Sequence, residues 1–270
     1  MTAEIDMTAN SPLETAFDPA LCMARQSLYR CAALSLLDPQ TGSWEQLHAL
    51  RTDRLLTEAA TLIREHPAAR VRQFARGERP LADLDPQRVL DRLPRSRVAL
   101  NDQYEQTFGL LVSNACPPYE TEYIDSKLSF QRSNTLADVN GFYLAFGLKT
   151  SQQNPERPDH VVLELEFMAF LLGLELQAGD GDPSKRNDRL EVCRVAQGRF
   201  LREHLAWWVP AFAHLLGKES AGGFYEAVSV FAAALIAAER ASLHVPVPAT
   251  LARPAVGQLD ECAGCLHNAE

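Results

Sequence analysis

The chain has 270 residues, of which 46% are hydrophobic and 23% charged, and this composition is typical of a globular protein. The formal net charge of −9 disfavours binding to nucleic acid and favours a basic partner such as a cationic peptide. The N-terminus carries acids where a signal peptide has lysine or arginine. The richest apolar run, residues 231–238, is far shorter than the roughly 18 residues of a membrane-spanning helix. We therefore expect a cytoplasmic protein without stable membrane insertion.

Helical spacing dominates the first 110 residues. Asp18 followed by a proline predicts an N-cap and a first helical residue, and Asp38 followed by a proline predicts the end of that helix. Ser43 and Gln46 form a capping-box pattern that opens the next helix. Further helices are expected over 43–62, 67–76, 86–93 and 96–111.

Two adjacent prolines interrupt the helical pattern at residues 116–123, CPPYETEY. Helix resumes over 127–146, where Gly141 is expected to let another helix approach closely and Gly147 to form the C-cap. Its apolar face consists of Val139, Phe142, Tyr143 and Phe146. The last helices are expected over 160–177, 184–204, 206–216 and 222–240. Because alternating strand patterns and repeats are missing from the sequence, we predict an all-α fold of about nine or ten helices.

The domain organisation follows from composition. Residues 1–243 are expected to form a single all-α domain, in which a hinge loop at about 149–160 joins two helical halves. Residues 244–270 are expected to form a loose tail. Six cysteines in 270 residues do not make a disulfide scaffold. Three of them lie in helical patterns and are predicted to be buried thiols: Cys22, Cys31 and Cys193.

The loop ERPDH, residues 156–160, precedes a helix that is apolar around its whole circumference and is therefore predicted to be buried. Asp159 occupies the position of an N-cap, and His160 would follow in the first turn. Glu164 and Glu166 point to faces about 160° apart. At least one of them is expected to lie among apolar groups, where an internal arginine or tyrosine is its simplest partner.

Acids and aromatic residues also alternate in CPPYETEY, through Tyr119, Glu120 and Glu122, and Asp138 adds an acid to an otherwise apolar helix. This mixture suits a site that receives a guanidinium together with an apolar segment, because arginine stacks on aromatic faces and forks onto carboxylates. A solvated acidic loop explains the same pattern equally well.

At these residues the sequence resembles the TorD/DmsD/NarJ family of redox-enzyme maturation chaperones. The resemblance rests on the segments 104–108, 116–123, 137–148 and 156–168. The glutamate-proline-aspartate-histidine mark of the family loop is complete. Its aromatic-x-x-leucine-phenylalanine mark is partial, since Tyr104 and Phe108 fit but Thr107 replaces the leucine.

The resemblance implies a TorD-like helical bundle that is not an enzyme and binds no cofactor of its own. It implies binding to the catalytic subunit of a dimethyl-sulfoxide-reductase-type molybdoenzyme until the molybdenum cofactor is inserted, and to the twin-arginine signal peptide where the client has one. It also implies a monomer or a domain-swapped dimer. Asp159 and His160 inherit the binding role of the family loop. The full expected partner-binding set is Tyr104, Phe108, Tyr119, Glu120, Glu122, Glu156, Pro158, Asp159, His160 and Glu164.

Three alternatives remain open at the level of sequence. Catalysis is disfavoured, because H-E-x-x-H, G-x-S-x-G and paired Glu-x-x-His patterns are missing. A metal- or redox-responsive helical protein would use the tail, where Cys262, Cys265 and His267 are weak metal candidates and His244 a possible fourth ligand. A flexible tail with two free thiols is the simpler interpretation. A subunit that stays in a mature complex is the third alternative.

Overall fold

The computed structural model describes residues 17–109, 115–124, 129–149, 151 and 156–249. Within these ranges the chain forms ten α-helices, one π-helical turn and short 3₁₀ turns, without a strand. The predicted all-α class is thereby confirmed. The helices are α1 Pro19–Leu36, α2 Ser43–Leu50, α3 Leu55–Glu65, α4 Pro86–Asp91, α5 Arg97–Phe108, α6 Ser129–Ala145, α7 Val161–Asp180, α8 Pro183–Phe200, α9 Ala206–Glu219 and α10 Phe224–Ser242. None of the described helices combines the length and apolar character that a bilayer crossing requires.

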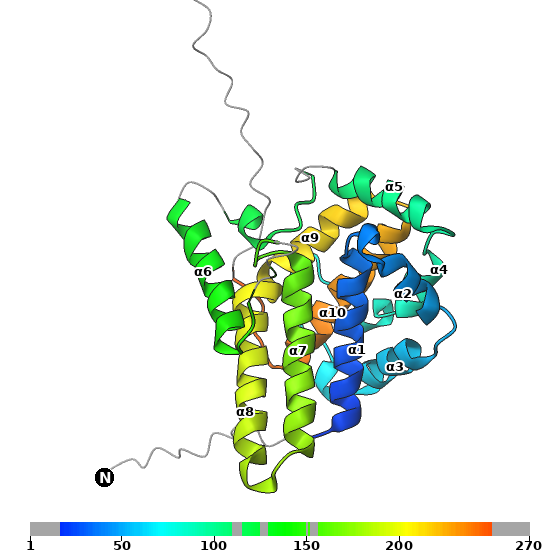
Figure 1. Ribbon diagram of the computed structural model, residues 1–270. Coiled ribbons are helices and arrows are strands. Elements are labelled where there is room, and N and C mark those ends of the chain that lie inside the picture. Colours follow the sequence, from blue (N-terminus) through cyan, green and yellow to red (C-terminus); the bar gives the residue numbers. More distant parts are fainter. Residues whose placement is uncertain (1–16, 110–114, 125–128, 150, 152–155, 250–270) are drawn as a thin grey trace, which may run out of the picture.

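Two long helices, α1 and α7, lie side by side through the middle of the bundle (Figure 1). Helix α8 packs against α7 on one side, and α3 packs against α1 on the other. Helices α9 and α10 pack against each other, and α10 also contacts α1. Helix α6 lies at the outer edge (Figure 1), where Phe142 packs on Phe200 of α8 with ring centroids 5.2 Å apart.

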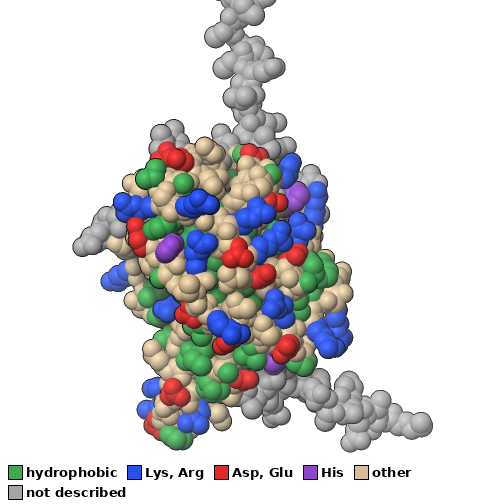
Figure 2. Space-filling model, turned by 90° about the vertical axis from the view of Figure 1, so that its right-hand side faces the viewer, with side chains coloured by type: hydrophobic (Ala, Val, Ile, Leu, Met, Phe, Trp, Pro, Cys, Tyr) green, Lys and Arg blue, Asp and Glu red, His purple; other side chains and the backbone are tan. Residues whose placement is uncertain are grey.

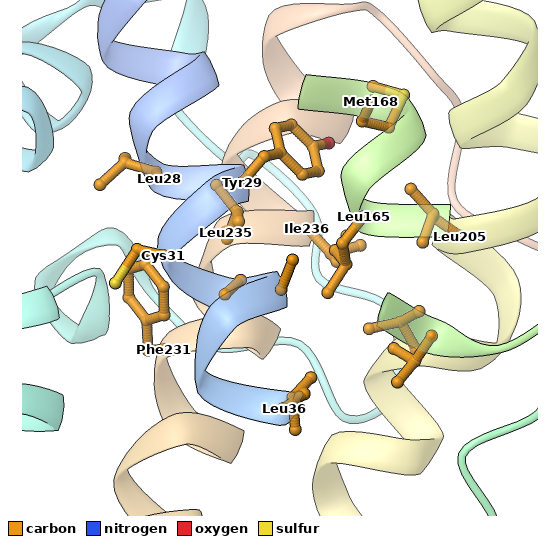
Figure 3. Close-up of a cluster of buried hydrophobic side chains, with 14 of the residues drawn as sticks. Leu28, Tyr29, Cys31, Leu36, Leu165, Met168, Leu205, Phe231, Leu235 and Ile236 are labelled. Atoms are coloured by element: carbon orange, nitrogen blue, oxygen red, sulfur yellow. The ribbon is translucent and has the colours of Figure 1, made fainter. Parts of the chain in front are cut away.

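Buried hydrophobic side chains of α1, α7 and α10 cluster together in the core (Figure 3). Leu28 of α1, Leu165 and Met168 of α7, and Ile236 of α10 are each fully buried there. Full burial of such a side chain stabilises the folded state by roughly 1.5–3 kcal/mol. This junction therefore fixes α7, the helix that carries the loop motif on its N-terminal end.

Several local predictions are confirmed. The carboxylate of Asp18 accepts from the amide of Ala20 at 2.9 Å, as expected of an N-cap. Gly147 has a φ of +76°, and the helix end is closed by a bond from the amide of Leu148 to the carbonyl of Tyr143 at 2.9 Å. The cysteines predicted to be buried thiols are buried and free: Cys22, Cys31 and Cys193. The helix-packing role predicted for Gly141 is wrong, because it lies exposed and nothing comes within 4 Å of where its Cβ would stand.

The predicted helix 43–62 is two helices, α2 and α3, and the capping-box prediction is wrong. Ser43 is itself the first helical residue, and its hydroxyl donates to the carbonyl of Leu37 at 3.3 Å instead of capping. Of the predicted helix 67–76 the structure shows only a 3₁₀ turn, Pro67–Ala69. The carbonyl of Gln73 is taken by the guanidinium of Arg240 at 2.5 Å, and so does not enter a helical ladder.

The predicted break between the helices 184–204 and 206–216 is a π-helical turn, Leu201–Leu205, which joins α8 to α9 without a loop. Of the predicted hinge, residues 150 and 152–155 lie outside the described residues, as do residues 250–270 of the predicted tail. The two-half division and the loose tail stay predictions. The metal candidates Cys262, Cys265 and His267 also lie outside the described residues.

Gly77 packs against the backbone of α9 with a φ of +91°, and a Cβ there would overlap the carbonyl of Pro210. We expect Gly77→Ala to lower the free energy of unfolding by about 2–4 kcal/mol, because left-handed strain and steric overlap add together. Gly222 is the matched control: its φ is +79° and nothing lies within 4 Å of its Cβ position. Gly222→Ala should cost only about 1 kcal/mol, from strain alone. Urea unfolding of both variants is the measurement, and equal losses would contradict the steric argument.

Candidate functional site

The loop that precedes α7 is paired with the segment that follows the two adjacent prolines. Tyr119 and His160 form an isolated antiparallel bridge. The amide of Glu120 donates to the carbonyl of Asp159 at 3.0 Å. Two stretches that are distant in sequence are thus held together, and the site residues predicted in each of them lie side by side.

Asp159 is fully buried and secures this pairing instead of capping the helix. Its carboxylate accepts from the amide and hydroxyl of Thr121 at 3.1 and 2.8 Å, and from two nitrogens of Arg157 at 3.0 and 2.8 Å. The predicted N-cap role of Asp159 is wrong. His160 is the N-cap, and its Nδ1 accepts from the amide of Val162 at 3.2 Å. The forked guanidinium offers this carboxylate two parallel, charge-assisted hydrogen bonds.

The acid–aromatic pattern suggests a site for a stacked guanidinium, and Arg157 of the chain itself provides that group. Its Cζ lies 4.2 Å from the centroid of the Tyr119 ring, and its Nη1 lies 3.3 Å from Glu122. The hydroxyl of Tyr119 donates in turn to Glu156 at 3.2 Å. The carboxylates of Asp159 and Glu122 are therefore already engaged by an arginine of the chain itself.

His160 is buried, and its ring meets the edge of the Tyr119 ring with centroids 5.1 Å apart. Burial lowers the pKa of His160 below its ordinary value, which suits a ring nitrogen that accepts the first free amide of α7. Pro158 places its carbonyl 2.9 Å from the hydroxyl of Tyr143, the donor, so that α6 is tied to the loop. The loop is thus joined to α6, to α7 and to the segment around Tyr119.

Behind the loop lie two fully buried glutamates, Glu120 and Glu164. Glu120 accepts from the indole of Trp207 at 2.7 Å and lies 3.0 Å from Nδ1 of His204. Glu164 accepts from the indole of Trp208 at 3.1 Å. Burial, followed by the charge of Glu120, raises the pKa of Glu164 well above its usual range. Burial also raises the pKa of Glu120, although bonds to His204 and Trp207 oppose the rise.

Glu164 and Glu166, near the start of α7, lie on different faces of the helix and differ in burial. The prediction that at least one lies among apolar groups is confirmed for Glu164, whose partner is a tryptophan and not an arginine or tyrosine. Glu166 is exposed, with Arg30 of α1 as a charged neighbour.

Tyr104 and Phe108 lie on α5 and pack together with Tyr225 of α10. Ring centroids of Phe108 and Tyr225 are 5.4 Å apart, and Phe108 is buried. Burial raises the pKa of Tyr104 to about 12, with contributions from the charges of Asp38, Tyr119 and Glu156. Tyr104 is half-buried beside the core, whereas Phe108 belongs to it.

An open groove of about 1140 Å³ runs over α1 and α7 and reaches the loop at Glu156. Its walls are mainly apolar and include Leu34, Leu37, Leu55, Leu163 and Phe170. Glu156 and Glu166 are balanced by Arg30 and Lys149 in its lining. Small-molecule pockets usually span about 300–1,000 Å³, so this groove is large enough for an apolar stretch of polypeptide. On the neighbouring face, which α2, α3 and α4 help to form, charges of both signs are interspersed (Figure 2).

Several contributors to the site carry no prediction from the sequence: Thr121, Arg157, His204, Trp207 and Trp208. The role of Arg157 could have been inferred from the sequence, because a buried acid needs a donor and Asp159 follows two residues later. The sequence indicates the role of the tryptophans more weakly, because a buried indole needs an acceptor but its identity is open. Nothing in the sequence indicates the role of His204, which lies 84 positions from Glu120.

The fold and the site define a helical bundle in which a Pro-Asp-His loop closes over buried carboxyls beside an apolar groove. A family model described as the nitrate reductase delta subunit matches residues 79–214, slightly more than half of the chain. The chain belongs to this family, which confirms the resemblance to the TorD/DmsD/NarJ group. The match covers the loop, the paired segment and both tryptophans.

Curated relatives agree with the family match. Chaperone protein TorD of Vibrio cholerae is 30% identical over 120 residues, 44% of this chain and 50% of that protein. The selenate reductase assembly chaperone protein of Thauera selenatis is 34% identical over 118 residues, 43% of this chain and 57% of that protein. The chlorate reductase assembly chaperone protein of Ideonella dechloratans is 37% identical over 86 residues, 32% of this chain and 42% of that protein. The chain spans about half the length of the curated relatives it matches.

Proposed function

We propose that this protein is a cytoplasmic assembly chaperone. It binds the catalytic subunit of a dimethyl-sulfoxide-reductase-type molybdoenzyme, and the twin-arginine signal peptide of that subunit where one exists, until the molybdenum cofactor is inserted. Family membership and relatives described as reductase assembly chaperones support this role. Binding without a catalytic step is all that the role requires.

The observation that carries the proposal is the continuity between the apolar groove and the loop. Glu156 lines the groove and accepts from Tyr119, which stacks under Arg157 of the same loop. A polypeptide segment in the groove would therefore contact the loop directly. Because the acidic and basic groups in the groove lining balance, the groove recognises the apolar part of a client, and burial of that part supplies most of the affinity.

Burial divides the expected partner-binding residues into two roles. Glu156 is exposed, and Tyr119, Glu122 and Pro158 are partly exposed, so these can touch a client. Asp159 and the other fully buried members, Glu120 and Glu164, cannot do so in this conformation. We propose that they position the loop.

Recovery of a client from cells tests the proposal. Tagged protein would be purified from cells blocked in molybdenum-cofactor synthesis and from cells supplied with the cofactor. We expect a molybdoenzyme catalytic subunit to be recovered from the blocked cells and to be largely released once cofactor is present. A chaperone leaves when the cofactor arrives, so equal recovery from both would indicate a permanent subunit. No recovery from either would refute the proposal.

A variant that places a charge in the groove tests whether the groove binds the client. Leu163 is half-buried in the groove wall. We expect Leu163→Glu to lower client recovery at least about tenfold, because an apolar segment would then bury an unpaired carboxylate. Val192→Glu, at an exposed position on α8, adds the same charge outside the groove and should leave recovery unchanged. Thermal unfolding of both variants controls for stability, and equal recovery from both would exclude the groove.

A further inference from the structure

A second hollow opens on the far side of the buried glutamates, between α6 and the π-helical turn. It encloses about 380 Å³. Its acidic lining residues are Glu120, Asp138 and Glu203, and His204 and Trp207 complete the wall toward the core. Asp138 stands at the mouth with 58% of its side chain exposed. Unlike the loop carboxylates, it has no arginine bound to it among the described residues.

The side chain that points to a ligand is His204, which is 2% exposed. Its Nδ1 faces the carboxylate of Glu120 at 3.0 Å, and Glu120 also accepts the indole of Trp207. A carboxylate that collects donors favours the tautomer with the proton on Nδ1, which leaves a lone pair on Nε2. That Nε2 has no hydrogen-bond partner in the described part of the chain and lies 3.4 Å from the carboxylate of Asp138. In that tautomer, Nε2 of His204 and the carboxylate of Asp138 are both acceptors, and among the described residues none donates to Nε2.

The neighbouring arginines do not donate a hydrogen bond to Nε2 of His204. Arg199 and Arg202 both bind Glu203, at 3.2 and 2.6 Å, and Arg199 also lies over the ring of Phe142. Both guanidinium groups are thereby engaged by Glu203, which together with the weaker effect of Asp138 raises the pKa of Arg199. The turn itself is π-helical, and π-helical turns occur frequently at functional sites.

We propose that this hollow binds a guanidinium group, namely an arginine side chain of the client polypeptide. A guanidinium carries five N–H donors and no acceptor, so it satisfies Nε2 of His204 and the carboxylate of Asp138 together. It also stacks on aromatic faces such as that of Trp207. This inference rests on the proposed function and assigns the cationic part of the client to a site separate from the loop, where Arg157 already occupies the carboxylates.

Calorimetric titration tests the site with two synthetic peptides. One carries two adjacent arginines before an apolar segment, and the other has glutamines in place of both arginines. The protein variants are Asp138→Asn at the mouth and Asp188→Asn, an exposed acid on α8, as the control with the same change in net charge. We expect Asp138→Asn to weaken the arginine peptide about five- to tenfold and to leave the glutamine peptide unchanged. Asp188→Asn should change neither affinity.

A second readout separates contact from long-range attraction. The Nε2 resonance of ¹⁵N-labelled His204 should shift on addition of the arginine peptide but not of the glutamine peptide, because only the former brings a donor. Equal affinities of the two peptides for the unaltered protein would overturn the inference, as would equal effects of the two aspartate variants or failure of the arginine peptide to bind. Client recovery in the purification experiment would stand in each of these cases, so that the proposed function fails only if that recovery fails.

Discussion

Asp159→Ala is expected to lower the free energy of unfolding by about 2–4 kcal/mol. It is also expected to reduce client recovery at least about tenfold, which corresponds to a loss of about 1.4 kcal/mol in binding free energy. The carboxylate is fully buried and accepts from Thr121 and Arg157 through bonds of 2.8–3.1 Å. Without it, the hydroxyl of Thr121 loses a partner and Arg157 is no longer held over Tyr119. The helices do not depend on these bonds, so the helical content of the folded variant should remain nearly unchanged. Urea unfolding followed by circular dichroism measures both quantities.

Two further variants separate charge from shape. Asp159→Asn keeps an acceptor for Thr121 but removes the charge that pairs with Arg157, and it should fall between Asp159→Ala and the unaltered protein. Glu156→Gln changes an exposed acid of the same loop and should alter stability by no more than about 0.5 kcal/mol. If Asp159→Ala unfolds at the same urea concentration as the unaltered protein, the positioning role of this carboxylate is refuted.

The helices were predictable where local chemistry alone decides them. The Asp-Pro pairs at 18–19 and 85–86 begin α1 and α4, each with the aspartate as cap. Prediction failed over 43–62 and 67–76, where tertiary contacts compete with helical spacing. Arg240 of α10 donates a hydrogen bond to a backbone carbonyl of the second segment, and the local sequence of 67–76 does not indicate this partner.

The sequence was sufficient to predict which residues lie together in the site, but not which hydrogen bonds join them. The sequence placed Glu120 and Asp159 in one site because each belongs to a dense group of acids and aromatic residues. It could not reveal that Asp159 binds Thr121, 38 positions away, or that Glu120 binds His204. Such pairs form only when α6, α7 and the turn after α8 have packed. Burial could not be read from the sequence either, since Glu120 and Asp159 are fully buried whereas Glu156 of the same loop is exposed.

Glu164, buried near the start of α7, leads to the second large effect, a dependence of stability on pH that Glu164→Gln should remove. Burial and the charge of Glu120 raise the pKa of Glu164 well above its usual range, so the folded state retains a proton that the unfolded chain releases near pH 4.3. The resulting stabilisation is complete below that pH and is lost as the pH rises toward the raised value. The slope is up to about 1.4 kcal/mol per pH unit for one proton.

Glutamine has the same shape, needs no proton and still offers an oxygen to the indole of Trp208. We therefore expect the stability advantage of Glu164→Gln over the unaltered protein to grow as the pH rises above 5, as measured by urea unfolding at several pH values. Because the charge of Glu120 acts directly on Glu164, the difference between the two proteins reports this pair of interacting carboxyls, with Glu164 as the group removed. Glu191→Gln, at an exposed position on α8, should give a curve parallel to that of the unaltered protein. Parallel curves for Glu164→Gln as well would mean that this carboxyl is already ionised in the folded state, and that a cation or water reaches it behind the loop.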